Sequence, residues 1–537
     1  MNYFTFSSFF AKIIIFLFPF ALLASSDHTH EHFLKCLTTR ISTHETIIYT
    51  RNDTSYSTLL NSFIQNQRFN STPKPFAIIT PFHVSHIQVT VYCSQKHGML
   101  IKVRSGGHDY EGLSYVSNEL PFIILELRNL SSISVDVEDK SAWVQAGATV
   151  GEVYFRVAEK TGNLSFPAGG CSTVGVGGHL SAGGYGYLAR KYGLSADNIV
   201  DAQIIDAQGR LLDRKSMGED LFWAIRGGGA ASFGIVAAWK LQLVPVPSTV
   251  TVFNVQRNMD DDATKKLVHR WQRRAHKVDD DLTIFIRFVT MNSTDKKGNK
   301  KITIQPNFSA TFLGGVDTLL QLMQKEFPEM GLVRQDCTEM RYVESYLYYT
   351  GQGTGSLDPL LDRTIVSTGL SYKMKSDYVK ELIPDDVVEG MLGRLYDEEV
   401  GMTTIDFFPY GGKMDKILES AIPFPHRAGN LFNIHYQVTY KGASKKHLSW
   451  IRRLYNYMTP YVSKNPRTVY FNFRDLDIGM NEKRSNSTST LTRIAKANIW
   501  GTKYFKNNFN KLIQVKTKVD PADFFRNEQS IPSLLAP

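Results

Sequence analysis

Two glycine-rich stretches of the chain each carry one nucleophilic side chain. The first runs Arg104-Ser105-Gly106-Gly107-His108-Asp109-Tyr110, and the second runs Gly169-Gly170-Cys171-Ser172-Thr173-Val174-Gly175-Val176-Gly177-Gly178-His179. Glycine has no Cβ and tolerates positive φ, so such loops let a backbone approach a phosphate or a flat ring closely. An imidazole and a thiol can both attach covalently to an oxidised ring system. Together the two loops favour a flavin held at two points.

A third glycine cluster, residues 226–234, follows an acidic and aromatic helical segment. None of the three clusters has the Gly-x-Gly-x-x-Gly spacing between a strand and a helix with an acidic residue about twenty positions later. The sequence therefore disfavours a Rossmann dinucleotide fold, and we expect no metal site.

The elements that must position these loops alternate in type from about Pro75 to Val250. Short β-branched runs predict strands, and the segment from Val150 to Thr161 predicts an amphipathic helix between two of them. The strands are expected at 76–80, 101–104, 122–127 and 141–146. Strand ends supply loops, which is where sheet proteins bind cofactors.

The Val244-Pro245-Val246-Pro247-Ser248 stretch predicts a domain boundary. Residues 250–465 mix long strands with helices at 264–276 and 317–326, which indicates a broad antiparallel sheet backed by helices. After Pro466 a shorter segment is expected to be helical near 504–510 and to return to the first domain.

Bulk composition bounds the class of protein. A chain of 537 residues with 42% hydrophobic residues is long enough for a large core and two or three domains. The formal net charge is +10, but Lys and Arg are scattered along the sequence. This distribution indicates a solvated basic surface and no nucleic-acid partner.

The first 26 residues have the pattern of a secretory signal peptide: Lys12, an apolar run from Ile13 to Leu23, then small residues. No later segment reaches about 18 consecutive apolar residues, so we expect a soluble mature protein without a membrane anchor. Asn-x-Ser/Thr acceptors occur at Asn52, Asn70, Asn129, Asn163, Asn292, Asn307 and Asn486 and favour a secreted glycoprotein.

An oxidising compartment favours a disulfide among the four cysteines. Cys36 and Cys93 both precede the glycine loops and form the favoured pair, which leaves Cys171 free for cofactor chemistry. The alternative pairs Cys171 with Cys337, although a thiol in a Gly-Gly-Cys loop is a poor structural link.

With these loops in place, the chain resembles the plant berberine-bridge-enzyme-like family of vanillyl-alcohol-oxidase-type flavoproteins, and is especially similar to the cannabinoid acid synthases. The resemblance covers essentially the whole mature chain, including the terminal segment 525–532. It implies FAD attached bicovalently through His108 and Cys171. Further FAD contacts are expected from Arg104, Ser105, Gly106, Gly107, Val174, Gly175, Gly178, His179 and Asn472.

The resemblance also implies the α+β fold of this superfamily. A two-part FAD-binding domain would comprise residues 27–249 and a C-terminal segment, 466–537, that returns to it. A substrate domain of residues 250–465, with an antiparallel sheet backed by helices, would cover the flavin ring. Val174 lies where family oxidases carry a valine that leaves oxygen access to the flavin.

The candidate active site departs from the family pattern in two respects, a lost hydroxyl and changed polar groups. Family oxidases generally carry Asn-Tyr-Arg-Asp-Leu-Asp, whose tyrosine is a general base, whereas this chain has Phe473 there and no hydroxyl. His435 falls where relatives place Glu or Gln, and its imidazole could replace the lost base. Arg287 falls where cannabinoid synthases present a histidine, and it can form an ion pair or bind an oxygen anion but cannot act as a base.

Two tyrosines complete the candidate set. Tyr110 lies two residues after His108 and is expected to face the substrate cavity, and Tyr192 resembles a family tyrosine near the flavin or the substrate. For either residue a core position with a satisfied hydroxyl is the alternative.

Three functions are compatible with these residues. The favoured one is a stereoselective [4+2] cyclisation of a prenyl-derived diene with a chalcone-type dienophile, in which Arg287 and His435 polarise the carbonyl, as in mulberry members of the family. The alternative is oxidation of a prenylated phenol, with His435 as base and O2 reduced to hydrogen peroxide. A secreted glycoprotein that keeps FAD only as a structural element is disfavoured because the cavity keeps its polar residues. We expect a monomer in the apoplast or vacuole.

Overall fold

The computed structural model describes residues 30–536, except 43–44, 46, 63, 65, 295–299, 354, 365–369, 398–401, 443–444 and 483–488. The predicted signal peptide lies outside the described residues. In the part of the chain that is described, no helix is both long enough and apolar enough to cross a membrane.

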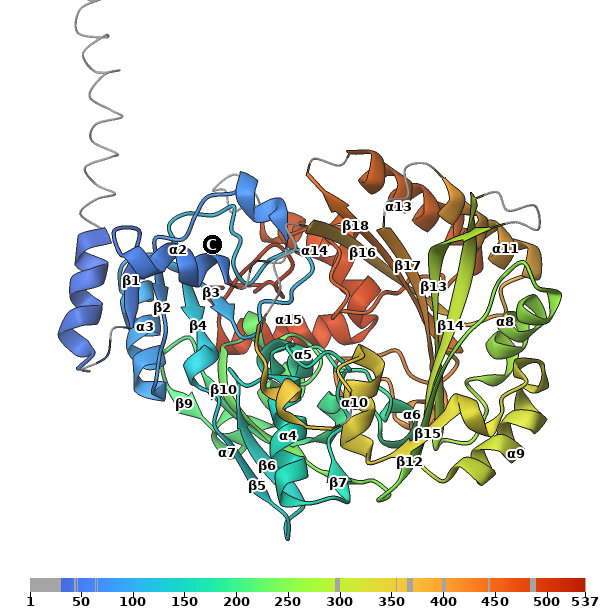
Figure 1. The fold of residues 1–537 in the computed structure, drawn as a ribbon. Helices are drawn as coiled ribbons and strands as arrows, with labels where there is room; N and C mark the ends of the chain where they lie inside the picture. The colour runs from blue at the N-terminus through green and yellow to red at the C-terminus, as the bar shows by residue number, and fades with distance from the viewer. Residues whose placement is uncertain are drawn as a thin grey trace, which may run out of the picture.

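The N-terminal half contains two main sheets (Figure 1). The first has the order β1-β2-β4-β3, in which β2, β4 and β3 are parallel. Its strands are β1 (Ile48–Thr50), β2 (Ala77–Ile79), β3 (Leu100–Arg104) and β4 (Phe122–Glu126). The second sheet is antiparallel, with the order β5-β6-β10-β8-β9. Its strands are β5 (Ile133–Asp136), β6 (Ser141–Gln145), β8 (Ile199–Ile205), β9 (Leu211–Leu212) and β10 (Ile235–Gln242).

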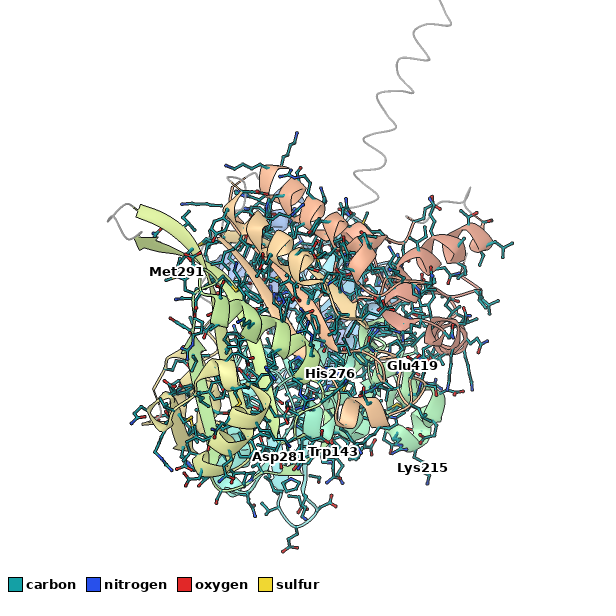
Figure 2. The ribbon with its side chains drawn as sticks, turned by 90° about the vertical axis from the view of Figure 1, so that its right-hand side faces the viewer. Trp143, Lys215, His276, Asp281, Met291 and Glu419 are labelled. Atoms are coloured by element: carbon teal, nitrogen blue, oxygen red, sulfur yellow. A yellow bond between two sulfur atoms is a disulfide. The ribbon has the colours of Figure 1, made fainter. Side chains whose placement is uncertain are left out.

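A small two-stranded sheet, β7 (Leu164–Ser165) with β11 (Val244–Pro245), precedes the large sheet of the second half. That large sheet is antiparallel, with the order β15-β12-β14-β13-β17-β18-β16. Its strands are β12 (Val250–Gln256), β13 (Leu282–Thr294), β14 (Lys300–Phe312), β15 (Cys337–Met340), β16 (Leu370–Val379), β17 (Met402–Pro409) and β18 (Phe432–Lys441). The long β13–β14 pair extends past the neighbouring strands near Met291 (Figure 2).

Helices cover the outer face of the large sheet (Figure 1). They bury a core that includes Trp271, Phe407 and Tyr436. These helices are α8 (Asp262–Arg274), α9 (Val316–Glu326), α11 (Asp385–Gly393) and α13 (Lys445–Tyr457). The prediction of a broad antiparallel sheet backed by helices is therefore confirmed, because apolar residues alternate along each strand toward these helices.

The remaining helices belong mainly to the other half of the molecule. They are α2 (Thr54–Asn61), α3 (Val84–Lys96), α4 (Val150–Lys160), α5 (Val176–Ser181), α6 (Ala189–Tyr192), α7 (Arg214–Ile225), α10 (Tyr342–Thr350), α12 (Lys413–Lys416), α14 (Thr490–Phe505) and α15 (Asn508–Val519). The last helix returns to the first half of the chain, since α15 packs on α7 and the Lys516 ammonium donates to the Ser232 carbonyl.

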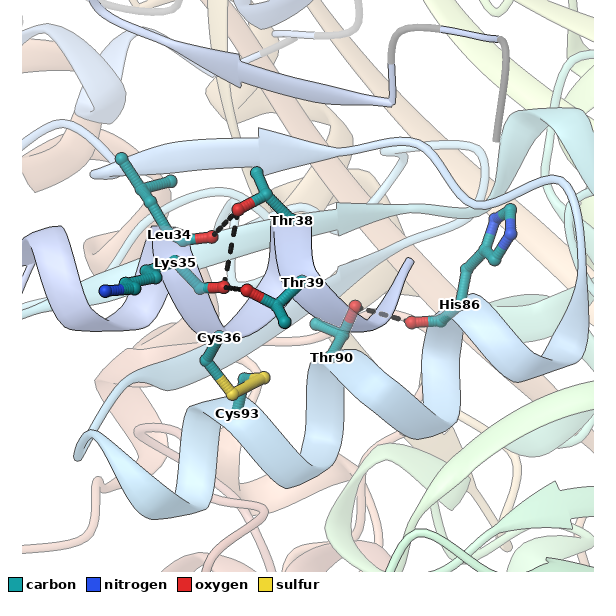
Figure 3. Close-up of a disulfide and its surroundings, with 8 residues drawn as sticks. All are labelled: Leu34, Lys35, Cys36, Thr38, Thr39, His86, Thr90 and Cys93. Carbon is teal, nitrogen blue, oxygen red and sulfur yellow. Dashed lines mark hydrogen bonds between the residues drawn. A yellow bond between two sulfur atoms is a disulfide. The ribbon is translucent and has the colours of Figure 1, made fainter. Parts of the chain in front are cut away.

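A disulfide joins Cys36 to Cys93, as predicted (Figure 3). Cys93 lies on α3, and Cys36 lies on a helix formed by residues 30–40. Cys171 and Cys337 are both free thiols. The bond therefore ties the N-terminal helix to α3 and leaves the thiol of the second glycine loop available.

Candidate active site

A cavity of about 670 Å³ lies between the glycine loops and the inner face of the large sheet. The glycine loops line one wall. Alternate residues of β13, β17 and β18 line the other: Phe285, Arg287, Asp406, Phe408, Asn433, His435 and Gln437. Because strand side chains alternate in direction, the residues between them enter the outer core instead.

The two glycine loops touch backbone to backbone. A Cβ added at Gly106 would lie 2.3 Å from the Gly175 nitrogen, and one added at Gly175 would lie 2.2 Å from the Gly106 nitrogen. Only glycine fits at either position, so the absence of two side chains allows contact between loops about seventy residues apart. This contact places His108 and Cys171 at one cavity wall.

Thr173 connects the two candidate attachment residues. Its Oγ1 lies 3.0 Å from Nε2 of His108 and 3.6 Å from Sγ of Cys171. Burial lowers the pKa of His108 to about 4, so its imidazole is neutral at physiological pH and keeps a lone pair for bond formation.

The other predicted loop contacts fall on the same wall. Its lining includes Ser105, Gly106, Gly107, Val174, Gly175, Gly178, His179 and Asn472. Burial lowers the pKa of His179 to about 4, and its Nε2 accepts a hydrogen bond from the Gly169 amide at 3.0 Å. Asn472 donates to the His179 carbonyl at 3.0 Å and so joins the C-terminal segment to the second loop.

Arg104 and Tyr192 do not take the places predicted for them, since neither lines this cavity. Arg104 is fully buried, forms an ion pair with Glu126 and donates to two backbone carbonyls of α2, so it anchors the first loop from behind. Tyr192 ends α6, and its hydroxyl donates to the Pro245 carbonyl at 2.5 Å. The alternative given for Tyr192, a structural position with a satisfied hydroxyl, is therefore the better description.

On the sheet wall, Arg287, Asp406 and His435 form a row across three neighbouring strands. The strand register pairs Arg287 with Asp406 and Asp406 with His435. Nε and Nη2 of Arg287 donate to the two carboxylate oxygens of Asp406 at 2.6 and 3.2 Å. Nδ1 of His435 lies 3.2 Å from Oδ2 of Asp406.

The charges in this row are mutually stabilised. Burial alone would raise the pKa of Asp406, but the Arg287 charge and hydrogen bonds from His435 and Arg287 outweigh burial and hold that pKa below its usual value. The Asp406 charge in turn raises the pKa of Arg287. The Arg287 side chain remains 57% exposed, whereas the Asp406 side chain is 2% exposed.

Aromatic rings surround this row. The His435 ring stacks on Phe473 with centroids 4.2 Å apart, and Tyr110 lies 6.1 Å from His435 and 6.0 Å from Phe473. Tyr110 therefore faces the cavity as predicted, and burial raises the pKa of its phenol. Tyr187 stacks on Phe285 at 4.3 Å and extends the aromatic wall.

A buried ionic cluster joins the two walls behind these rings. Lys373 of β16 forms ion pairs with Glu111 and, at 2.7 Å, with Asp475. Lys375 bonds Asp475 at 2.7 Å and Asp477 at 2.9 Å. The cluster thereby fixes the Tyr110 loop and the Phe473 segment to the large sheet.

Comparison with known proteins decides the family. A family profile described as FAD binding domain matches residues 75–214, and one described as berberine and berberine like matches residues 469–532. Cannabidiolic acid synthase-like 1 of Cannabis sativa is 50% identical over 535 residues, which cover 97% of each chain. Tetrahydroberberine oxidase of Berberis wilsoniae is 51% identical over 95% of each chain.

The chain belongs to the berberine bridge enzyme-like family of FAD-dependent oxidoreductases. Its fold agrees with that of a solved member, berberine bridge enzyme-like protein 28 of Arabidopsis thaliana, at a TM-score of 0.85 and 45% identity. That alignment covers 94% of this chain and 99% of the other.

The residues present fit the FAD of a berberine bridge enzyme-like protein. Cβ atoms added at Gly170 and Gly178 of the cavity lining would meet nothing within 4 Å, so this wall leaves open space for a flat ring. A neutral imidazole and a free thiol lie beside it. The cavity volume is within the range of about 300–1,000 Å³ that is usual for ligand pockets.

Sequence reasoning missed Asp406, Thr173 and the lysines of the ionic cluster. Asp406 had a detectable signal, because a lone carboxylate in Thr404-Ile405-Asp406-Phe407-Phe408 interrupts an apolar strand and must find a partner there. Thr173 had no such signal, since its role depends on the contact between the two loops.

Proposed function

We propose that this FAD-linked enzyme of the secretory pathway catalyses a [4+2] cyclisation between a prenyl-derived diene and a chalcone-type enone. The observation that carries the proposal is the Arg287 guanidinium, anchored to Asp406 yet 57% exposed in the cavity. Among the described residues, Nη1 of Arg287 has no hydrogen-bond partner. Its N–H groups are therefore available to a substrate carbonyl. Donation to that oxygen withdraws electron density from the enone and lowers the barrier to diene attack.

The rest of the sheet wall supports a reaction without proton removal. Nδ1 of His435 bonds Asp406, its Nε2 lies 3.1 Å from Sδ of Met374, and Phe473 offers no hydroxyl. His435 therefore acts through Asp406 to orient the guanidinium. The rings of Phe473, Phe408 and Phe285 offer apolar faces on which two flat reactants can be held together.

Oxidation of a prenylated phenol is the second candidate, and the contact between His435 and Asp406 favours it. Beside an ionised Asp406, Nδ1 carries the proton and Nε2 is a proton acceptor. A phenol that displaces the Met374 side chain could give its proton to Nε2. Bound FAD supplies a hydride acceptor that O2 can reoxidise, and one relative is named an oxidase.

An anaerobic incubation separates the two candidates. The purified yellow protein is mixed with a prenyl-derived diene and a chalcone, and flavin absorbance and products are followed together. An adduct formed while the flavin stays oxidised supports cyclisation. Loss of flavin absorbance, followed by hydrogen peroxide once air is admitted, contradicts it and supports oxidation.

Arg287→Met tests the carrying observation. We expect adduct formation to slow by about 10²-fold, the usual cost of removing one donor to a reacting oxygen. Arg334→Met is the matched control, since Arg334 is 56% exposed and paired with Asp317 but lies outside the cavity lining. Equal rates in the two variants would refute the role of Arg287.

We infer that FAD is attached at both His108 and Cys171, supported by the shared contact with Thr173. Entry to the secretory pathway is supported by the Cys36–Cys93 disulfide, since such bonds persist in oxidising compartments. We propose that the mature protein is a monomeric glycoprotein of the apoplast or vacuole.

A further inference from the structure

We propose that Asp406 determines the substrate class by charge, so that the site accepts neutral aryl ketones and excludes aryl carboxylates. Asp406 forms a two-bond ion pair with Arg287, and both side chains line the cavity. The ion pair as a whole therefore has no net charge, while the guanidinium still presents N–H donors to the cavity. A neutral carbonyl oxygen gains those hydrogen bonds at little desolvation cost, whereas a carboxylate loses its hydration with no cation left to compensate it.

The remainder of the cavity has the same charge balance. Each Lys, Arg or Asp side chain that lines the described part of the cavity lies in an ion pair. Besides Arg287–Asp406, the pairs are Lys102–Glu528 at 3.5 Å, Arg474–Asp109 at 3.1 Å and Arg526–Glu119 at 2.9 Å. Among the described lining residues, no other cation is therefore free to receive a substrate carboxylate near Arg287.

The inference rests on the proposed role of Arg287 as a donor to a substrate oxygen. It adds a specificity that Arg287 alone would not give, because an unpaired arginine binds carboxylates more strongly than ketones. Asp406 is 2% exposed, so it acts by cancelling the charge of Arg287 and not by touching the ligand widely.

Two probes of the same shape test this inference on the FAD-loaded protein. 2′-Hydroxyacetophenone and salicylate share an ortho-hydroxyl ring, and they differ in a methyl ketone against a carboxylate. Isothermal titration at pH 7 gives the ratio of their dissociation constants. We expect the ketone to bind at least about tenfold more tightly to the wild-type protein. Tighter binding of salicylate would overturn the inference without any variant.

Asp406→Asn should reverse the ratio, because an amide of the same size leaves the Arg287 charge uncompensated. The matched control is Asp377→Asn. Asp377 is a buried carboxylate that pairs with Arg467 at 2.6 Å, and neither residue lines the cavity. The control should keep the wild-type ratio. An unchanged ratio in folded Asp406→Asn, or an equal change in both variants, would overturn the inference.

Arg287→Gln provides a second variant if Asp406→Asn does not fold. It leaves the Asp406 charge uncompensated, so salicylate binding should fall further behind ketone binding than in the wild type, and a narrower gap would contradict the inference. Binding is measured without a diene and without turnover. A protein that prefers the ketone but forms no adduct would refute the cyclisation alone, whereas a protein that forms adducts but prefers salicylate would refute this inference alone.

Discussion

The glycine-loop wall and the sheet wall of the cavity hold their chemical groups in different ways. On the loop wall, backbone touches backbone at Gly106 and Gly175, and the reactive side chains lie within a few residues of that contact. On the sheet wall, Arg287, Asp406 and His435 come from three strands and are held by each other's charges and hydrogen bonds. The loop wall therefore depends on the absence of side chains, and the sheet wall depends on their pairing.

Gly106→Ala should break the loop wall and have the largest effect. The new Cβ would lie 2.3 Å from the backbone nitrogen of Gly175, which cannot move without displacing the second loop. We expect loss of bound FAD and a destabilisation of more than about 4 kcal/mol, measured by flavin absorbance and chemical denaturation. Gly162→Ala is the control, because its Cβ would meet nothing within 4 Å and Gly162 lies outside the cavity lining. Similar losses in both variants would show that the contact is not the cause.

Lys373→Met should separate the two walls. The change leaves Glu111 and Asp475 buried together without their shared cation, at a cost of about 3–5 kcal/mol. Denaturation at pH 7 measures this loss. Lys325→Met is the control, because the Lys325 side chain is 79% exposed and should contribute little.

The pH dependence of stability gives a further test of the same cluster. Burial alone would lower the pKa of Lys373, but Asp475, Glu111 and Asp477 outweigh burial and raise it. The contribution of Lys373 to the free energy of unfolding is therefore fully present below the unfolded lysine pKa of about 10.4. It is lost as the pH rises from there through the higher pKa of the folded state. The wild-type protein should lose stability more steeply than Lys373→Met as pH rises past 10. Parallel curves would contradict the pairing.

Removing either proposed attachment residue should leave FAD held by a single bond without unfolding the protein. After acid denaturation, His108→Ala and Cys171→Ala should each keep FAD through the remaining bond, and the double variant should release it. Mass spectrometry of the denatured protein measures the attachment. If a single variant releases all of its FAD, the residue replaced in that variant forms the only bond to FAD.

Phe473→Tyr should have the smallest effect and should act only on the sheet wall. It adds a hydroxyl to the ring that stacks 4.2 Å from His435 and so supplies a proton acceptor. We expect oxygen consumption with a prenylated phenol to rise by about tenfold or more, while FAD content stays constant. Phe471→Tyr is the control, since Phe471 packs on Tyr504 and Phe505. No rise in either variant would show that a hydroxyl at position 473 does not supply the proton acceptor.

Much of the fold followed from periodicity. The helix expected at 150–161 is α4, and those expected at 264–276 and 317–326 are α8 and α9, within one or two residues at most ends. These amphipathic segments need only local spacing to be recognised. The strand partners could not be predicted, because β12 pairs with β15 and β16 lies at the edge beyond β18, and such orders depend on distant chain segments.

The candidate site divides in the same way. Tyr192 matched a pattern, but its hydroxyl donates to the Pro245 carbonyl outside the cavity lining, a contact that local sequence does not reveal. Arg104 belongs to the first loop, yet its burial against Glu126 turns it behind that loop. Asp406 was overlooked because one carboxylate in a strand carries no motif, although strand register brings it between Arg287 and His435.

The sequence alone determined the glycine loops, their imidazole and thiol, and the absence of a hydroxyl at Phe473, because these are properties of single residues and short spacings. Only the tertiary structure decided that Gly106 meets Gly175 and that the charge of Arg287 is cancelled by Asp406. Both contacts join segments more than sixty residues apart. Such a contact forms only when the whole chain has folded, since the free energy that brings the segments together comes from the cores on either side of the cavity.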